Sequence, residues 1–87
     1  MDSYRIAWKH SAIEELKYLP KEILVRIVQA VENLAENPFP AGVKKLVGSE
    51  HTYRIREGSY RVIFTVATSS LVIEIVRVGH RKDVYYR

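Results

Sequence analysis

The chain has 87 residues, of which 47% are hydrophobic and 28% are charged, and it contains no cysteine. This length supports one hydrophobic core, and the apolar fraction is that of a folded chain rather than a disordered one, so we expect residues 1–87 to form a single domain. Without cysteine, disulfides and thiolate metal sites are excluded. No apolar run approaches the ~20 residues of a membrane span, and the N-terminus has no signal-peptide core, so the expected location is cytoplasmic.

The net charge of +4 is unevenly distributed along the chain. Residues 1–41 carry five basic and six acidic side chains, whereas residues 42–87 carry nine basic and four acidic ones. A basic half joined to a nearly neutral half indicates one cationic face, which is typical of nucleic-acid binders. Chance clustering on a solvated surface would produce the same imbalance, so charge alone leaves both interpretations open.

The first half of the chain predicts one strand and two helices. Residues 4–8 alternate weakly between apolar and polar, which favours a strand, and residues 9–19 predict a short amphipathic helix that ends before Pro20. Apolar residues between positions 23 and 35 recur at helical spacing and predict a longer second helix. Asn37-Pro38 ends it, because proline disfavours helix in the residue before it.

The second half of the chain predicts an antiparallel sheet. Residues 39–48 contain prolines, glycines and lysines and predict a loop, after which the period changes to two. Residues 53–56, 60–67 and 71–78 predict three strands joined by tight turns. We therefore expect an α+β fold in the order strand, two helices, three strands, with both helices packed on one face of a twisted, mainly antiparallel sheet.

Alternation along the predicted strands separates the arginines from the core. Val62, Phe64 and Val66 share one parity and should meet the helices, whereas Arg61 has the opposite parity. Arg54 and Arg56 are two residues apart and should share a face. We expect these arginines to be exposed, because burial of an unpaired charge is very costly.

Arginines grouped near a histidine and a tyrosine suit the chemistry of a phosphodiester. Metal-free RNA cleavage uses the neighbouring 2′-hydroxyl as nucleophile and needs cations on the phosphorane oxygens, a base and an acid. The candidates for charge stabilisation are Arg54, Arg56, Arg61 and Arg81. Arginine is always protonated, so the candidates for proton transfer are His80, because histidine titrates near neutrality, and the phenol of Tyr85 or Tyr86.

Each candidate also has an ordinary structural interpretation. Arg54 and Arg56 fit a solvated strand face, Arg61 fits an ion pair with Glu57 or Glu74, and His80 fits a surface position at a strand end. Likewise, the two tyrosines fit packing near the terminus. No His-x-x-x-His pair, aspartate cluster or glycine-rich phosphate loop is present, so we expect no metal and no cofactor.

Four segments in order resemble the RelE-type toxins of the RelE/ParE superfamily. They are Lys44-Lys45-Leu46-Val47-Gly48, which resembles a K-x-L-x-G segment, Tyr53-Arg-Ile-Arg56, Gly58-Ser-Tyr-Arg61-Val-Ile-Phe64 and Val76-Arg-Val-Gly-His-Arg-Lys-Asp-Val-Tyr85. The resemblance covers essentially the whole chain. It implies the toxin component of a type II toxin–antitoxin system, a metal-independent mRNA endoribonuclease that cuts in the ribosomal A site and inhibits translation. The implied partners are mRNA on the 70S ribosome, 16S rRNA and a cognate RelB-like antitoxin, with no membrane.

The resemblance also assigns residues to roles. Arg54 and Arg56 fall at the family's basic pair, Arg61 at the arginine that contacts the scissile phosphate, and Arg81 at the arginine after the last strand. Tyr85 matches the C-terminal aromatic residue, with Tyr86 as the neighbouring alternative register. The expected additional RNA-binding residues are Lys44, Lys45, Arg77 and Lys82. The best-known members carry lysines at the basic pair, so the arginines here place proton transfer on His80 or Tyr85.

Two other functions remain open at this point. The ParE branch of the same superfamily inhibits DNA gyrase without cutting RNA, but its members usually have longer N-terminal helices and lack the His-Arg-Tyr ending present here. A nucleic-acid-binding module without catalysis would use the same basic face. It would show salt-dependent binding but no product with a 2′,3′-cyclic phosphate end.

Overall fold

The computed structural model describes residues 3–82 and 84 of the chain. The elements run β1 (Arg5–Trp8), α1 (His10–Leu16), α2 (Lys21–Leu34), β2 (Lys44–Lys45), β3 (Thr52–Glu57), β4 (Tyr60–Ala67) and β5 (Val72–His80). This is the predicted α+β class. In this part of the chain, neither helix is both long and apolar enough to cross a membrane.

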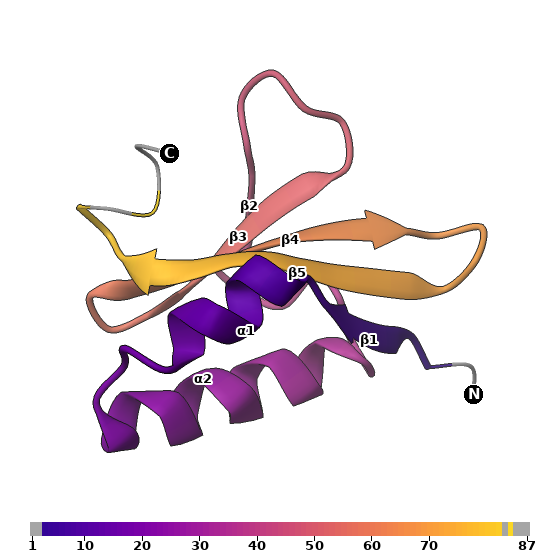
Figure 1. Ribbon diagram of the computed structural model, residues 1–87. Coiled ribbons are helices and arrows are strands. Elements are labelled where there is room, and N and C mark those ends of the chain that lie inside the picture. Colours follow the sequence, from indigo (N-terminus) through magenta and orange to yellow (C-terminus); the bar gives the residue numbers. More distant parts are fainter. Residues whose placement is uncertain (1–2, 83, 85–87) are drawn as a thin grey trace.

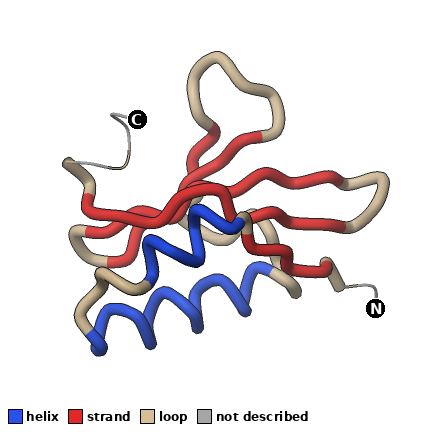
Figure 2. Tube along the Cα trace, in the orientation of Figure 1, coloured by secondary structure: helices blue, strands red, loops and turns tan. Residues whose placement is uncertain are grey.

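The strands form one sheet in the order β1-β5-β4-β3-β2. The β4–β5, β3–β4 and β2–β3 pairs are antiparallel, whereas β1 runs parallel to β5. Both helices lie on the same side of the sheet, as predicted (Figures 1 and 2). The other side of the sheet carries no helix of the described residues, although Arg61 and Ile63, which point there, are both buried.

Several boundaries differ from the prediction, among them that of the last strand, which runs over Val72–His80 rather than 71–78. The predicted loop at 39–48 contains β2, whose two residues are too few to show a period. The first helix stops at Leu16 rather than reaching residue 19, and a turn leads from it into Pro20. The second helix ends at Leu34, three residues before Asn37, whose backbone N–H still bonds to the carbonyl of Asn33.

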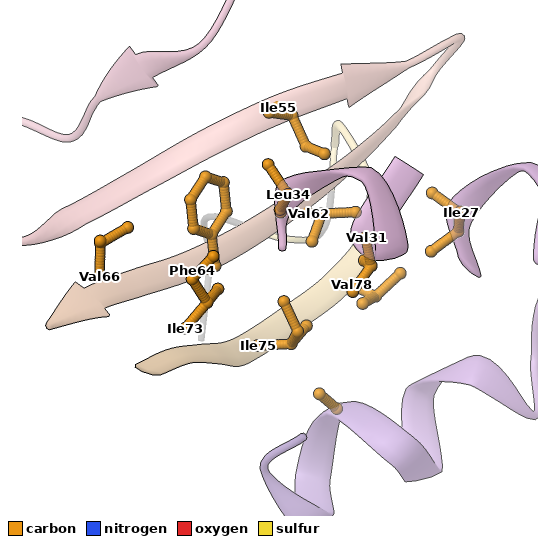
Figure 3. Close-up of a cluster of buried hydrophobic side chains, with 11 residues drawn as sticks. Ile27, Val31, Leu34, Ile55, Val62, Phe64, Val66, Ile73, Ile75 and Val78 are labelled. Atoms are coloured by element: carbon orange, nitrogen blue, oxygen red, sulfur yellow. The ribbon is translucent and has the colours of Figure 1, made fainter. Parts of the chain in front are cut away.

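The core lies between the helices and the sheet, as the strand parity predicts. Val62, Phe64 and Val66 of β4 are buried and form one cluster with α2 residues Ile27 and Leu34. Figure 3 shows these side chains meeting residues of β3 and β5 in a single layer. Full burial of one such side chain contributes about 1.5–3 kcal/mol, so this layer is the main source of the fold's stability.

Glu15 fixes α1 to the free edge of β5. Pairing with β1 ends at Ile75, which leaves later backbone groups of β5 without a strand partner on that side. The Glu15 carboxylate accepts a hydrogen bond of 2.9 Å from the Val78 backbone N–H and an ion-pair contact of 3.2 Å from Arg77 Nη2. A shift in the β4–β5 register at Ile63, typical of a β-bulge, occurs beside this contact.

Candidate nucleic-acid interface

Three arginines of β3 and β4 share the sheet face that the helices leave open. Arg54 and Arg56 alternate with Ile55, which belongs to the core cluster under the helices. The strand register places Arg56 directly opposite Arg61. Directly opposed residues in an antiparallel pair have Cβ atoms roughly 4.5–5.5 Å apart. We refer to Arg54, Arg56 and Arg61 as the arginine face.

Arg61 is buried, contrary to the expectation that it would be exposed. Its residue exposure is 8%, and its Nη1 donates hydrogen bonds to the carbonyls of Gly58, at 3.0 Å, and Tyr60, at 2.9 Å. The alternative of an ion pair with Glu57 or Glu74 is not realised among the described residues, where Glu57 instead accepts a 3.0 Å bond from Arg26 Nε. The carbonyls of Gly58 and Tyr60 therefore offset the desolvation cost of burying the Arg61 guanidinium group, and the sequence alone does not show these two acceptors.

The turn between β3 and β4 supplies these carbonyls through an unusual backbone conformation. Gly58 has a φ of +61°, and Ser59, which follows it, does not share the left-handed φ. Glycine at the first central position is the pattern of a type II′ hairpin turn. The carbonyl of Ser59 accepts a 2.8 Å bond from the backbone N–H of Arg81, so the predicted arginine after β5 lies beside the turn that holds Arg61.

The arginine face keeps its positive charge within residues 3–82 and 84. The ion pairs there join Lys17 to Glu14, Arg26 to Glu57 and Arg77 to Glu15. No acidic side chain of the described residues therefore pairs with Arg54, Arg56 or Arg61. Guanidinium groups without an acidic partner on one face attract anions, and their fork geometry suits phosphate oxygens.

His80 lies on the other side of the sheet from the arginine face. It is the register partner of Tyr60, which packs against the core, and the two rings meet edge-on at 5.6 Å. The His80 side chain also accepts a 3.2 Å hydrogen bond at Nδ1 from the backbone N–H of Lys82. The structure therefore does not bring His80 together with Arg54, Arg56 and Arg61.

The cleft beside His80 differs in charge from the arginine face. It lies between α1 and the end of β5, and its lining includes His10, Glu14, Glu15 and His80. A hydrogen bond and the charge of Lys17 lower the pKa of the Glu14 carboxyl group. The cleft therefore combines acidic and basic side chains, which makes it a poorer phosphate site than the open face of the sheet.

The other predicted RNA-binding residues occupy different surroundings. Lys44 pairs with Arg54 and so shares its side of the sheet, whereas Lys45 pairs with Tyr53, whose ring stacks on the core residue Phe64. Arg77 is about 19% exposed and bound to Glu15, so it adds little charge to an RNA surface. Lys82 is exposed in the turn after β5.

The backbone near the end of the chain contains a contact that sequence reasoning missed. Gly79 is the β5 register partner of Arg61, and a Cβ placed on it would lie 3.7 Å from the Cβ of Val84. Val84 is 3% exposed, so this residue packs beside Gly79, the strand neighbour of Arg61. Glycine inside a strand is a known signal of such close approach. The predicted Tyr85 and its alternative Tyr86 lie outside the described residues.

Comparisons with known proteins identify the family of the chain. Residues 6–85 match the family described as the ParE toxin of the type II toxin–antitoxin system, parDE. Toxin RelG of Mycobacterium tuberculosis is 31% identical over an alignment of 88 positions, which covers 97% of this chain and 98% of RelG.

Solved structures of toxin–antitoxin complexes share the fold. The archaeal RelE–RelB complex from Pyrococcus horikoshii OT3 matches with a TM-score of 0.82 and 31% identity, covering 94% of this chain and 99% of that chain. The RelBE2 complex of Mycobacterium tuberculosis matches with a TM-score of 0.80 and 27% identity, covering 91% and 99% respectively. The chain therefore belongs to the RelE/ParE superfamily of type II toxin–antitoxin toxins and resembles its RelE members over nearly its whole length.

Proposed function

We propose that this protein is a ribosome-dependent endoribonuclease that cuts mRNA in the A site and thereby inhibits translation. The observation that carries the proposal is the arginine face, where Arg56 and Arg61 oppose each other and Arg54 lies two residues away on the same side. No described acidic residue neutralises these groups. A cationic face of this kind suits a phosphodiester better than it suits a neutral ligand.

In the proposed reaction, the 2′-oxygen of one nucleotide attacks the adjacent phosphorus atom. The bond from phosphorus to the 5′-oxygen of the next nucleotide breaks, leaving a 2′,3′-cyclic phosphate on one fragment and a 5′-hydroxyl on the other. A base takes the proton of the 2′-hydroxyl, and an acid delivers one to the 5′-oxygen. Negative charge builds up on the equatorial oxygens, and loss of one well-placed donor to such oxygens typically costs ~10²–10³ in rate.

Arg61 is the donor whose side chain two hydrogen bonds already hold in position for this charge. Its Nη1 is bound to two carbonyls, which fixes the guanidinium plane, and no described residue accepts a hydrogen bond from its Nε or Nη2. Those N–H groups form the fork that binds two phosphate oxygens at once. Arg54 and Arg56 are more exposed than Arg61, and we assign them to neighbouring phosphates of the RNA backbone. Arg81 lies in the turn after β5, where its backbone N–H bonds to the turn that holds Arg61.

Proton transfer needs a group other than these arginines, which stay protonated throughout. Tyr85 follows Val84, the residue that packs beside Gly79, and we assign proton transfer to its phenol. A phenol is a weak catalyst at neutral pH. The ribosome therefore contributes by holding the mRNA in attack geometry, and such positioning is worth up to several kcal/mol. Free RNA is expected to be a poor substrate.

A cognate antitoxin is the second partner that we propose. The similar structures from Pyrococcus and Mycobacterium are complexes of toxins with antitoxins. Residues 42–87 carry nine basic and four acidic side chains, so an acidic, partly disordered chain would be attracted to this half and fold on binding. Release of bound antitoxin by high salt would support this electrostatic attraction.

A purified translation system tests the nuclease directly. Primer extension maps cuts in an mRNA with and without ribosomes, for the wild type, Arg61→Gln and the control Arg5→Gln, which changes an exposed arginine of β1. Ribosome-dependent cuts that vanish only in Arg61→Gln support the proposal. Intact mRNA combined with inhibition of gyrase supercoiling assigns the chain to ParE-type activity instead. Silence in both assays leaves a binding module without catalysis.

A further inference from the structure

His80 makes a contact that a catalytic base or acid would not need. The backbone N–H of Lys82 donates a 3.2 Å hydrogen bond to Nδ1 of the imidazole. Because an acceptor nitrogen carries no proton, the neutral ring must hold its hydrogen on Nε2. The side chain thereby closes a turn over its own next two residues, in the way that asparagine side chains do in Asx turns.

The His80 ring is also held in place by an aromatic neighbour on β4. Tyr60 faces His80 across β4 and β5, and their ring centroids are 5.6 Å apart at an interplanar angle of 80°. This pair lies on the helix side of the sheet, with Tyr60 packed against the core cluster. The imidazole is therefore anchored away from the arginine face while its Nδ1 points at the backbone of the next turn.

Arg81 is the residue that this turn encloses. Its backbone N–H bonds to the Ser59 carbonyl at 2.8 Å, and the N–H of Val84 bonds to the His80 carbonyl at 3.0 Å. Together with the Lys82 bond, these contacts fix the backbone on both sides of Arg81. Of these three hydrogen bonds, the one to the imidazole involves a side chain, so a substitution of His80 removes it and leaves the two backbone bonds in place.

We propose that His80 is a positioning residue, which holds Arg81 in place through the Lys82 N–H and takes no part in proton transfer. The inference rests on the proposed nuclease function, since Arg81 is assigned to phosphate stabilisation there. His80 cannot fill both roles, because a protonated Nδ1 no longer accepts the hydrogen bond from Lys82.

Two substitutions separate positioning from proton transfer. His80→Asn supplies an oxygen that accepts from the N–H two residues on, but an amide cannot carry a proton in catalysis. His80→Phe keeps the ring contact with Tyr60 but has no acceptor. A positioning role predicts that His80→Asn cuts A-site mRNA at nearly the wild-type rate, while His80→Phe loses about ten- to a hundredfold, mainly in kcat.

A double variant tests whether His80 acts through Arg81. In an Arg81→Ala background, His80→Phe should cause no further loss of cleavage, because the group that it positions is already absent. Equal, large losses in His80→Asn and His80→Phe would instead identify His80 as a proton carrier. Full activity in both variants would show that it has no role, and either outcome overturns the proposal.

A spectroscopic readout on the free protein keeps this test independent of nuclease activity. The temperature coefficient of the Lys82 amide proton shift should be small in the wild type and His80→Asn, as for a bonded amide, and larger in His80→Phe. If the wild type cuts no mRNA, the proposed function fails while this readout still tests the turn. An unchanged Lys82 coefficient in His80→Phe overturns the positioning role by itself.

Discussion

Arg56 lies directly opposite Arg61 across the β3–β4 ladder, and neither has an acidic partner among the described residues. Like charges at this position disfavour strand pairing, by an amount comparable to the ~0.2–1 kcal/mol that favourable pairs contribute. A phosphate bound between the two guanidinium groups would turn this repulsion into attraction. Under the proposed function, the pair belongs to a phosphate site in which the two like charges repel each other when no phosphate is bound.

The first prediction follows from this repulsion. Arg56→Gln should raise the free energy of unfolding by about 0.2–1 kcal/mol while it lowers mRNA cleavage by about a hundredfold. Urea denaturation and primer extension measure the two effects. Arg5→Gln serves as the control, because Arg5 is also an exposed strand arginine but lies on β1 at the opposite edge of the sheet. A destabilised Arg56→Gln protein would contradict the account.

The second prediction concerns the turn that holds Arg61. Gly58→Ala forces a side chain into a φ of +61° and should cost about 1–2 kcal/mol of stability. Gly48→Ala is the matched control, because Gly48 has a φ of +85° in the loop between β2 and β3 and an added Cβ there would meet no atom within 4 Å. Both variants should lose stability, but only Gly58→Ala should also lose cleavage at a temperature where both remain folded. Equal activities would show that the turn carbonyls do not position Arg61.

Adjacent lysines provide the third prediction. Lys44 shares its side of the sheet with Arg54, while Lys45 pairs with Tyr53 on the other side. Lys44→Gln should reduce the slope of log affinity against log salt for single-stranded RNA by about 0.7, the contribution of one phosphate contact. Lys45→Gln should leave the slope unchanged. Fluorescence anisotropy over a salt series measures both, and identical slopes for the two variants would argue against a one-sided RNA surface.

The fourth prediction tests how α1 is attached to β5. Glu15→Leu leaves the Val78 N–H without its acceptor and should cost about 1–3 kcal/mol of folding stability. Glu15→Gln keeps an oxygen for this N–H and loses the charge and the second acceptor oxygen opposite Arg77 Nη2, so it should be less destabilising than Glu15→Leu. Thermal denaturation followed by circular dichroism compares them. A Leu variant as stable as the Gln variant would mean that the carboxylate contact contributes little.

Much of the fold is predictable because it depends on periodic patterns. The helical stripe between residues 23 and 35 and the alternation of Val62, Phe64 and Val66 identify the two layers without any tertiary information. The parallel pairing of β1 with β5 is different, since a short strand carries no mark of its partner. The two residues of β2 likewise form a strand only because β3 is beside them.

The candidate site is predictable in composition but not in arrangement. Parity correctly places Arg54 and Arg56 on one face, but it cannot show that the carbonyls of Gly58 and Tyr60 make burial of Arg61 tolerable. The side of the sheet on which His80 lies depends on its register with Tyr60, which a sequence does not display. Residues adjacent in sequence, such as His80 and Arg81, can therefore contribute to function in different ways.

The most direct test of the proposed nuclease is cleavage of ribosome-bound mRNA whose A-site codon carries 2′-deoxynucleotides. We predict cutting of the ordinary codon, with a 2′,3′-cyclic phosphate at the new end, no cutting of the deoxy codon, and none by Arg61→Gln on either. Cutting of the deoxy codon would contradict attack by the 2′-hydroxyl. Cutting of the ordinary codon by Arg61→Gln at the wild-type rate would contradict the role of the arginine face.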